Sequence, residues 1–221
     1  MNRGPKPKGK VKLIWGSRFA YAIGLLVSDG CLSKNGRHVS LTSKGKVQLT
    51  AFNKCLDISV KISRKYSGAG RLSYYVQFSD VLFYRFLMSI GLMPAKSKIL
   101  SELDIPTKYF FDFLRGYFDG DGSSYSYYDP MFPASFRFYI SFASGSEEYV
   151  MWLQKQLYRH ARVKGFISRK KNTSHVQLKY AKREAGIIAQ KMYYHKALIC
   201  LERKRKKIVK AVQQIQRMSE W

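Results

Sequence analysis

The chain has 221 residues and a formal net charge of +26, because 40 Lys and Arg residues outnumber 14 Asp and Glu residues. Hydrophobic residues make up 46% of the sequence, which is enough for a packed core and excludes a disordered basic tail. No apolar run is long enough to cross a membrane and no export signal is visible, so we expect a folded protein that binds a polyanion. Nucleic acid fits better than an anionic membrane surface, because the basic residues are spread through strand-like segments instead of following one amphipathic helix.

The cysteines and histidines do not form a recognisable site. Cys31, Cys55 and Cys200 are widely spaced and have no histidine pattern nearby, so the sequence suggests neither a zinc module nor a disulfide framework. The four histidines are equally scattered. We therefore expect reduced thiols and no histidine-metal nuclease motif.

The first half begins with a basic, proline-containing stretch over residues 1–12, which predicts a flexible arm. Ser17 is the predicted N-cap of the first helix. Alternating polar and apolar residues predict strands, and apolar residues at helical spacing predict helices. The expected elements are helix 17–28, strand 38–42, helix 48–56, strands 60–66 and 71–78, and helix 81–90.

The second half repeats this plan. Its expected elements are helix 107–120, strand 137–142, helix 147–158, strands 165–170 and 175–180, and helix 184–194. The tyrosine-rich stretch 123–135 is expected to be a loop. The order helix, two strands, helix, two strands, helix, run through twice, predicts an α+β fold of two pseudo-symmetric αββαββα repeats, over residues 13–100 and 101–221. Gly24 and Gly116 would let the first helices of the two repeats approach closely.

One peptide signature occurs in both halves. Gly24-Leu-Leu-Val-Ser-Asp-Gly30 corresponds to Gly116-Tyr-Phe-Asp-Gly-Asp-Gly122, and each copy places an aspartate where a helix stops. A helix C-terminus already presents unpaired carbonyls with about half a negative charge, so Asp29 and Asp121 are unfavourable there without a cation. The duplication in a strongly basic chain argues against two aspartates that merely cap turns.

The extended signatures are Ala22-Ile-Gly-Leu-Leu-Val-Ser-Asp-Gly30 and Leu114-Arg-Gly-Tyr-Phe-Asp-Gly-Asp-Gly122. With these motifs the chain resembles the monomeric, double-motif LAGLIDADG homing endonucleases. The first copy departs from the pattern at Ala22 and at Val27, where the family has an acidic residue. The resemblance implies a saddle whose curved antiparallel sheets bind DNA, with one motif helix from each half at its centre.

The resemblance also implies the chemistry. Asp29 and Asp121 are the expected metal-binding and catalytic carboxylates, with the carbonyls of Ser28 and Gly120 as further ligands. Mg²⁺ suits such oxygen ligands, Mn²⁺ could replace it, and Ca²⁺ is expected to bind without supporting efficient cleavage. The expected reaction hydrolyses one phosphodiester on each strand of a long, non-palindromic DNA target and leaves 3' overhangs.

Lysines at the edge of the site are expected to stabilise the transition state. By resemblance Lys96 is the candidate of the first half, with Lys98 as its alternate, and Lys204 that of the second, with Arg203 as its alternate. Ser43 and Ser144, at strand ends, could hold solvent near the metals, although serines at such places are commonly turn formers.

The outward faces of the strands are rich in side chains that suit base edges. The predicted DNA-binding residues of the first half are His38, Ser40, Thr42, Lys61, Ser63, Lys65, Arg71, Ser73, Tyr75 and Gln77. Those of the second half are Arg137, Tyr139, Ser141, Ser168, Lys170, His175, Gln177 and Lys179.

Three alternatives remain open: an RNA maturase that binds intron RNA, a regulator that keeps the fold without cutting DNA, and a basic ribosome-associated protein. The last explains the charge but not the duplicated carboxylates. We expect a soluble, intracellular monomer, in a prokaryotic cytoplasm or an organelle, that is either intron-encoded or encoded by a free-standing gene.

Overall fold

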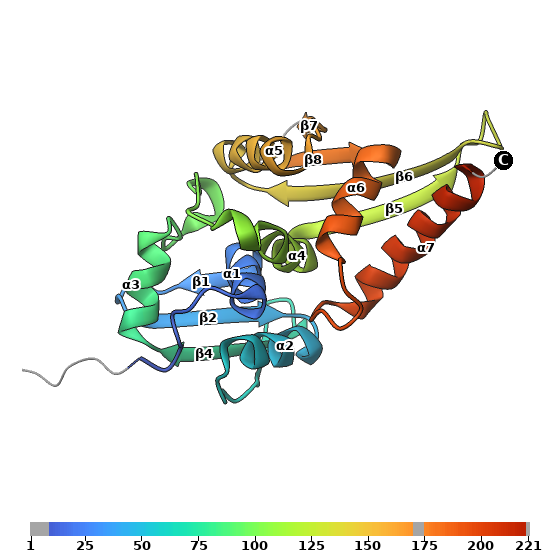
Figure 1. Cartoon of the computed structure of the whole chain (residues 1–221). Helices are drawn as coiled ribbons and strands as arrows, with labels where there is room; N and C mark the ends of the chain where they lie inside the picture. Colours follow the sequence, from blue (N-terminus) through green and yellow to red (C-terminus); the bar gives the residue numbers. More distant parts are fainter. Residues whose placement is uncertain (1–8, 170–174, 220–221) are drawn as a thin grey trace, which may run out of the picture.

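The computed structural model describes residues 9–169 and 175–219 (Figure 1). The elements of the first half are α1 (Ser17–Asp29), β1 (Gly30–Leu32), β2 (His38–Ser43), α2 (Lys46–Leu56), β3 (Ser63–Tyr66), β4 (Leu72–Ser79), α3 (Val81–Ser89) and the 3₁₀ turn η1 (Lys96–Lys98). Those of the second half are the 3₁₀ turn η2 (Thr107–Tyr109), α4 (Phe110–Asp121), β5 (Gly122–Tyr128), β6 (Phe136–Ser144), α5 (Glu147–Ala161), β7 (Phe166–Arg169), β8 (Val176–Ala181), α6 (Lys182–Met192) and α7 (Glu202–Ser219).

The two halves have the same sheet topology, which confirms the predicted pair of αββαββα repeats. One four-stranded antiparallel sheet has the order β1-β2-β4-β3, and the other has the order β5-β6-β8-β7. In each sheet one face packs on helices. Val39, Leu41 and Val76 are fully buried in the first sheet, as are Ile140, Phe142 and Leu178 in the second.

The helices α1 and α4 lie side by side at the centre of the molecule, between the sheets (Figure 1). Their backbones touch at the two glycines. A Cβ atom on Gly24 would lie 2.1 Å from the carbonyl oxygen of Phe113, and one on Gly116 would lie 2.0 Å from that of Tyr21. Only glycine permits this approach, so the predicted role of both residues is confirmed.

The N-terminal ends of α1 and α3 make contacts with distant parts of the chain. The N-cap of α1 is Gly16, whose backbone is extended, so the prediction that Ser17 caps this helix is wrong. Ser17 is instead the first helical residue, and its hydroxyl donates to Asp112 of α4 at 2.6 Å. Asp80 caps α3 and also accepts the backbone N–H groups of Lys10 and Val11, which ties down the end of the predicted arm. Residues 1–8 lie outside the described part of the chain.

Three elements were not located from the sequence. The strands β1 and β5 begin directly at the glycines that end the motif helices, and β5 includes most of the tyrosine-rich stretch predicted as a loop. The long helix α7 follows the last predicted helix and runs along β5 (Figure 1). It packs through Ile208 and Ala211, which are buried.

Candidate functional site

Four residues of the two motif helices meet where α1 and α4 end. Asp29 and Asp121 are the last residues of these helices, and the following glycines close them by donating to Leu26 and Phe118. Gly120 lies against the other helix, because a Cβ atom on it would be 1.9 Å from Ser28 Oγ and 2.9 Å from Asp29 Oδ2. The two halves therefore bring the predicted site residues Ser28, Asp29, Gly120 and Asp121 together.

The two carboxylates are held in an environment that disfavours their charge. The pKa of Asp121 is raised to about 6, chiefly by partial burial and then by the negative charge of Asp29. Burial also raises the pKa of Asp29, against the opposing effect of a hydrogen bond from Gln48 and of nearby Lys204 and Lys96. Asp121 still reaches solvent at the mouth of a pocket of about 360 Å³ that Lys98, Ser144 and His175 help to line. Such a pair is poised for a cation.

The predicted lysines occupy matching places in the two halves. Lys96 Nζ donates to the carbonyl oxygens of Ser28 and Gly30, at 3.4 and 2.5 Å. Lys204 Nζ donates to those of Phe118, Gly120 and Gly122, at 2.6, 3.1 and 2.7 Å. Each ammonium group thus lies at the negative end of the motif helix of its own half. Burial lowers the pKa of both lysines, that of Lys204 to about 8.

The oxygen atoms of this site can supply part of the coordination shell of a divalent cation, with other ligands supplying the rest. In the described ranges, no group of three or more His, Cys, Asp and Glu residues could hold a metal ion. The protein offers two carboxylates beside backbone carbonyls, and two of those carbonyls, of Ser28 and Gly120, accept hydrogen bonds from the lysines. Mg²⁺ is commonly held by one or two carboxylates together with water and substrate phosphates, which agrees with this sparse site.

Gln48 is a site residue that the sequence did not reveal. It is buried at the start of α2, and its side-chain amide donates to Asp29 Oδ2 at 3.2 Å, while its oxygen accepts from Ser43 at 2.8 Å. The same position in the second half, five residues after Ser144, is Tyr149, which is fully buried. The Tyr149 hydroxyl has no hydrogen-bond partner among the described residues. The two aspartates therefore have different neighbours.

Asp119 fills the acidic motif position that is Val27 in the first copy. Its buried Oδ2 accepts from the Tyr21 hydroxyl of the other half and from the backbone N–H of Leu201, both at 2.7 Å. Because Leu201 directly precedes α7, Asp119 fixes the start of the helix that carries Lys204. The first half achieves the same placement of Lys96 without a carboxylate, through η1.

The strand register groups most predicted DNA-binding residues of the first half on one open face. Cross-strand partners project to the same side of a sheet. Tyr75 is the partner of both Thr42 and Ser63, Gln77 of Ser40, Ser73 of Lys65, and Ser79 of His38. Lys61 and Arg71 lie just outside the strands.

The second sheet has a corresponding open face. Gln177 is the partner of Ser168, Lys179 of Ser141, and Arg137 and Tyr139 lie on the same side of β6. Ser141 is only 4% exposed, because it packs against Ser123 with 2.8 Å between the hydroxyl oxygens. His175 immediately precedes β8, and Lys170 lies outside the described residues. The register adds Ser123, Tyr125, Tyr127 and Phe166, which the sequence did not single out.

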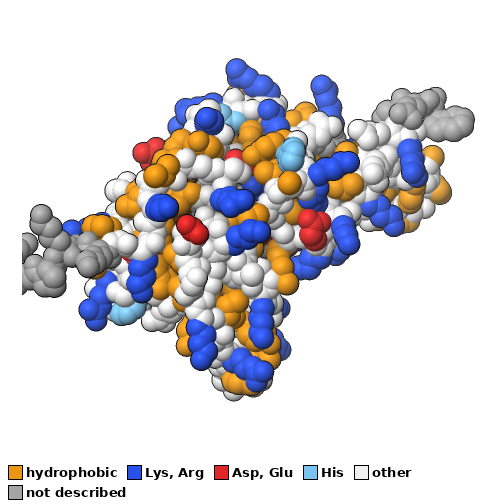
Figure 2. Space-filling model, turned by 60° about the horizontal axis from the view of Figure 1, so that its bottom comes forward, with side chains coloured by type: hydrophobic (Ala, Val, Ile, Leu, Met, Phe, Trp, Pro, Cys, Tyr) orange, Lys and Arg blue, Asp and Glu red, His pale blue; other side chains and the backbone are white. Residues whose placement is uncertain are grey.

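The surface has the charge that composition predicts. Figure 2 shows Lys and Arg side chains distributed over the whole face turned toward the viewer, with few Asp and Glu side chains among them. No helix in the described part of the chain is long and apolar enough to cross a membrane.

Comparisons with known proteins agree with this architecture. No protein-family model matches the sequence, and no curated protein matches it. The homing endonuclease I-WcaI, solved with its DNA recognition sequence, has a TM-score of 0.64 at 14% identity, covering 93% of this chain and 95% of its own. This chain has the LAGLIDADG homing endonuclease fold. I-LtrWI, a LAGLIDADG homing endonuclease bound to target DNA, has a TM-score of 0.61 at 11% identity, covering 92% of this chain and 91% of its own.

The LAGLIDADG fold also occurs in a protein that is not described as an endonuclease. The N-terminal LAGLIDADG domain of DUF199/WhiA has a TM-score of 0.53 at 15% identity and covers 84% of this chain and 86% of its own. At identities this low, structural similarity establishes the fold alone.

Proposed function

We propose that this protein is a site-specific, metal-dependent DNA endonuclease that hydrolyses one phosphodiester on each strand of a long, non-palindromic target. The observation that carries the proposal is the duplicated site: Asp29 and Asp121 meet at the ends of adjacent helices, and each helix end is contacted by one lysine, the buried Lys96 or the partly buried Lys204. A purely structural role would not require two carboxylates of raised pKa at the most crowded point between the halves.

In this mechanism Asp29 and Asp121, with the carbonyls of Ser28 and Gly120, would hold Mg²⁺. A bound divalent cation lowers the pKa of water and stabilises the charge that develops on phosphate. Lys96 and Lys204, whose ammonium groups lie at the ends of the same two helices, would place positive charge beside these phosphates. Gln48 fixes the orientation of Asp29 through its 3.2 Å hydrogen bond.

The open faces would hold the DNA on either side of this site. Lysine and arginine on these faces suit phosphate and guanine, and glutamine suits adenine. Because the two faces carry different side chains, the two half-sites should differ, and one chain should bind the whole target as a monomer. By analogy with other proteins of this fold, the staggered cuts should leave 3' overhangs.

The test begins with selection of a target from a randomised duplex library, followed by cleavage assays with Mg²⁺. Asp29→Asn and Asp121→Asn should each lower cleavage by roughly 100-fold or more while binding persists. Asp129→Asn, an aspartate in the turn after β5, is the control and should cut like the wild type. Mn²⁺ should replace Mg²⁺, and Ca²⁺ should support binding only.

A DNA-binding regulator is the second candidate, favoured by the shared fold with DUF199/WhiA. Tight, sequence-specific binding by the wild type without cutting in any of these metals would establish the regulator and overturn the endonuclease. Stimulation of intron splicing that survives both aspartate substitutions would instead indicate a maturase.

A further inference from the structure

Three tyrosines form a cluster on the open face of the second sheet. The rings of Tyr125 and Tyr139 stack with centroids 5.0 Å apart, and the Tyr127 ring lies 6.4 Å from each of them. All three ring planes agree within 19°. Tyr125 and Tyr127 are each 45% exposed, so these three residues, the tyrosine cluster, form part of the surface.

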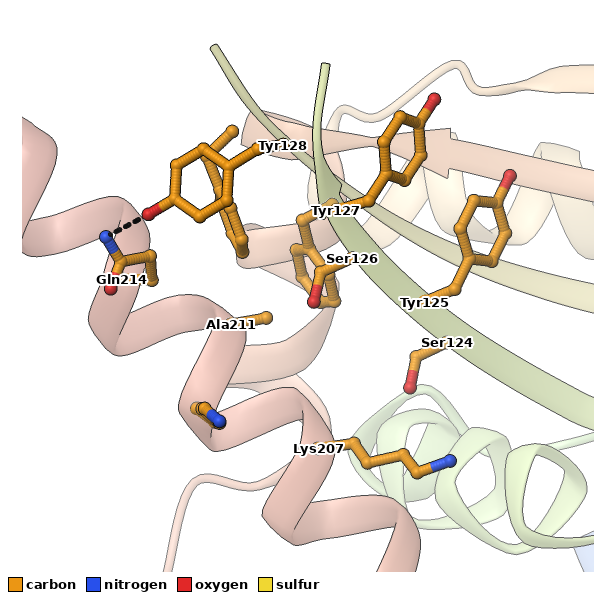
Figure 3. Close-up of a pocket in the computed structure, with 11 residues that line it drawn as sticks. Ser124, Tyr125, Ser126, Tyr127, Tyr128, Lys207, Ala211 and Gln214 are labelled. Atoms are coloured by element: carbon orange, nitrogen blue, oxygen red, sulfur yellow. Dashed lines mark hydrogen bonds between the residues drawn. The ribbon is translucent and has the colours of Figure 1, made fainter. Parts of the chain in front are cut away.

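The tyrosine cluster does not belong to the contact between β5 and α7. Figure 3 shows the rings of Tyr125 and Tyr127 pointing away from α7, whereas Tyr128 turns toward it. The Tyr128 hydroxyl accepts from the side chain of Gln214 at 2.8 Å. Because successive strand residues face opposite sides, β5 supplies one aromatic residue to the helix side and two to the open face.

The first half has no such cluster at the matching positions. Gly30 pairs with Leu41 as Gly122 pairs with Phe142, so Ser33 and Asn35 correspond to Tyr125 and Tyr127, and His38 corresponds to Tyr139. The Asn35 amide lies 2.6 Å from His38 Nδ1, which makes this part of the first face polar. The two halves would therefore offer DNA different chemistry at equal distances from the aspartates.

The chemistry of the tyrosine cluster is apolar and close to neutral, in contrast to the +26 charge of the chain. Arg137, the cross-strand partner of Tyr127, is paired with Asp129 at 3.0 Å. The tyrosine rings themselves carry no positive charge and are poorly suited to phosphate. The rings of Tyr125 and Tyr139 already stack on each other, so a base cannot stack between these two as on a single-stranded nucleic-acid platform. The exposed parts of Tyr125 and Tyr127 offer a ligand apolar ring surface and hydroxyl groups.

We propose that the tyrosine cluster is a specificity element that recognises thymine methyl groups in the major groove of the second half-site. Apolar contact with the thymine C5 methyl distinguishes thymine from the other bases without a hydrogen bond. The sheet's open face brings the rings to the groove, while Lys179 and Gln177 on the same face supply polar contacts. This inference rests on the proposed DNA-binding function.

The first test compares targets selected by the wild type and by the double variant Tyr125→Ser/Tyr127→Ser. The wild type should select thymine at two or three neighbouring positions on one side of the cleavage centre, and the double variant should lose that preference and no other. Tyr128→Ser, on the same strand but the α7 side, is the matched control and should keep it. Loss of preference spread over both half-sites would overturn the proposal.

The second test replaces each thymine of the selected target by deoxyuridine, which removes only the methyl group. Each replacement at a cluster position should weaken binding by the wild type roughly fourfold, the effect of losing one buried methyl group. In the double variant the same replacements should have no effect. Tyr125→Phe/Tyr127→Phe should retain the fourfold discrimination, and its loss would show recognition by the hydroxyl groups and overturn methyl contact.

The outcomes separate this inference from the proposed function. A wild type that binds its target but ignores thymine methyl groups in both half-sites overturns the inference alone. A wild type that binds no duplex DNA overturns the proposed function and with it the inference. A double variant that loses affinity for single-stranded RNA while its DNA selection is unchanged would show that the tyrosine cluster is a stacking surface, contrary to the proposal.

Discussion

At the scale of single residues, the catalytic function proposed here conflicts with stability. Asp121 is placed where partial burial and the charge of Asp29 raise its pKa to about 6. An aspartate whose pKa is raised in the folded protein lowers stability whenever it is ionised. The conflict is expected of a functional site in which a cation compensates the two carboxylates.

We predict that Asp121→Asn stabilises the metal-free protein. At pH 7.5 the gain should be about 1 kcal/mol, since the exposure of Asp121 lets solvent screen much of the unfavourable interaction. The destabilisation is fully present above pH 6 and disappears as the pH falls from 6 toward 3.8, the ordinary pKa of an aspartate, because the folded protein then takes up a proton. Chemical denaturation at pH 7.5 and pH 5 should show the gain shrinking at the lower pH.

Asp129→Asn is the control, because it should not stabilise the protein as Asp121→Asn does. Hydrogen bonds from the Met131 backbone and from Arg137 hold the pKa of Asp129 below its usual range, so losing its charge should not stabilise the fold. If both asparagine variants change stability in the same direction, burial and charge at the motif site are not the cause.

Gln48 is predicted to act on one strand of the DNA. Its amide holds Asp29, whereas Tyr149 at the matching position gives Asp121 no hydrogen bond. Gln48→Met should therefore slow the cut on one strand about 10- to 100-fold, the usual effect of losing a residue that orients a metal ligand. Nicked DNA should accumulate in a supercoiled-plasmid assay. Equal slowing of both strands would show that Gln48 supports the whole site instead of Asp29 alone.

At the scale of elements, contact between α1 and α4 holds the site together. Gly116→Ala would place a Cβ atom 2.0 Å from the Tyr21 carbonyl oxygen, so the helices would have to move apart. We predict destabilisation of about 3 kcal/mol or more, measured by urea unfolding. Gly186→Ala, in the middle of α6 with open space around it, is the control and should stabilise by about 0.5–1 kcal/mol. Wild-type stability of Gly116→Ala would refute backbone contact between the two helices.

The elements that the sequence predicted are those with strong local periodicity. The motif helices, the long strands and the repeated order all follow from alternating or helical spacing around Gly24 and Gly116. The strand β1 has only three residues, too few to show alternation, and its partner β2 fixes it instead. The helix α7 is mostly polar, and its few apolar residues are recognisable as a packing face only against β5.

The site residues likewise fall into those that a local sequence pattern predicts and those that depend on distant partners. Asp29 and Asp121 carried a local signal, an anion at a helix end repeated at matching places. Gln48 and Asp119 did not, because their partners lie far along the chain, at Asp29 and at Leu201. The Tyr149 counterpart shows why symmetry alone would not have revealed Gln48: one half uses an amide at this position, and the other uses a buried ring.

At the scale of the whole molecule, the backbones of the two repeats are arranged alike, but their side chains differ. The shared strand order places one carboxylate and one lysine per half at the centre. Away from the centre the halves diverge, with a polar first face and an aromatic cluster in the second. A single chain can thereby present two different reading surfaces at a fixed distance from two similar reactive groups.

The charge of +26 leads to a prediction that separates folding from binding. Like charges repel one another in the folded chain, so screening by salt should stabilise the free protein. Raising NaCl from 50 to 300 mM should increase the melting temperature by roughly 3–6 °C, the shift that about 1–2 kcal/mol produces in a chain of this size. Calorimetry on the free protein measures this effect, with sucrose as an uncharged control.

The same salt should act in the opposite direction on DNA binding. Phosphate contacts release counterions, so a protein that makes six to ten of them loses roughly 10³–10⁵ in affinity between 50 and 200 mM salt. A titration of labelled target DNA with an inactive Asp121→Asn variant measures the slope without cleavage. If salt instead lowers the melting temperature and leaves affinity unchanged, the positive charge is compensated within the fold, and a polyanion is not what the surface is built to bind. If salt raises the melting temperature of the free protein and lowers its affinity for DNA, then the positive charge that destabilises the free protein is the charge that DNA neutralises.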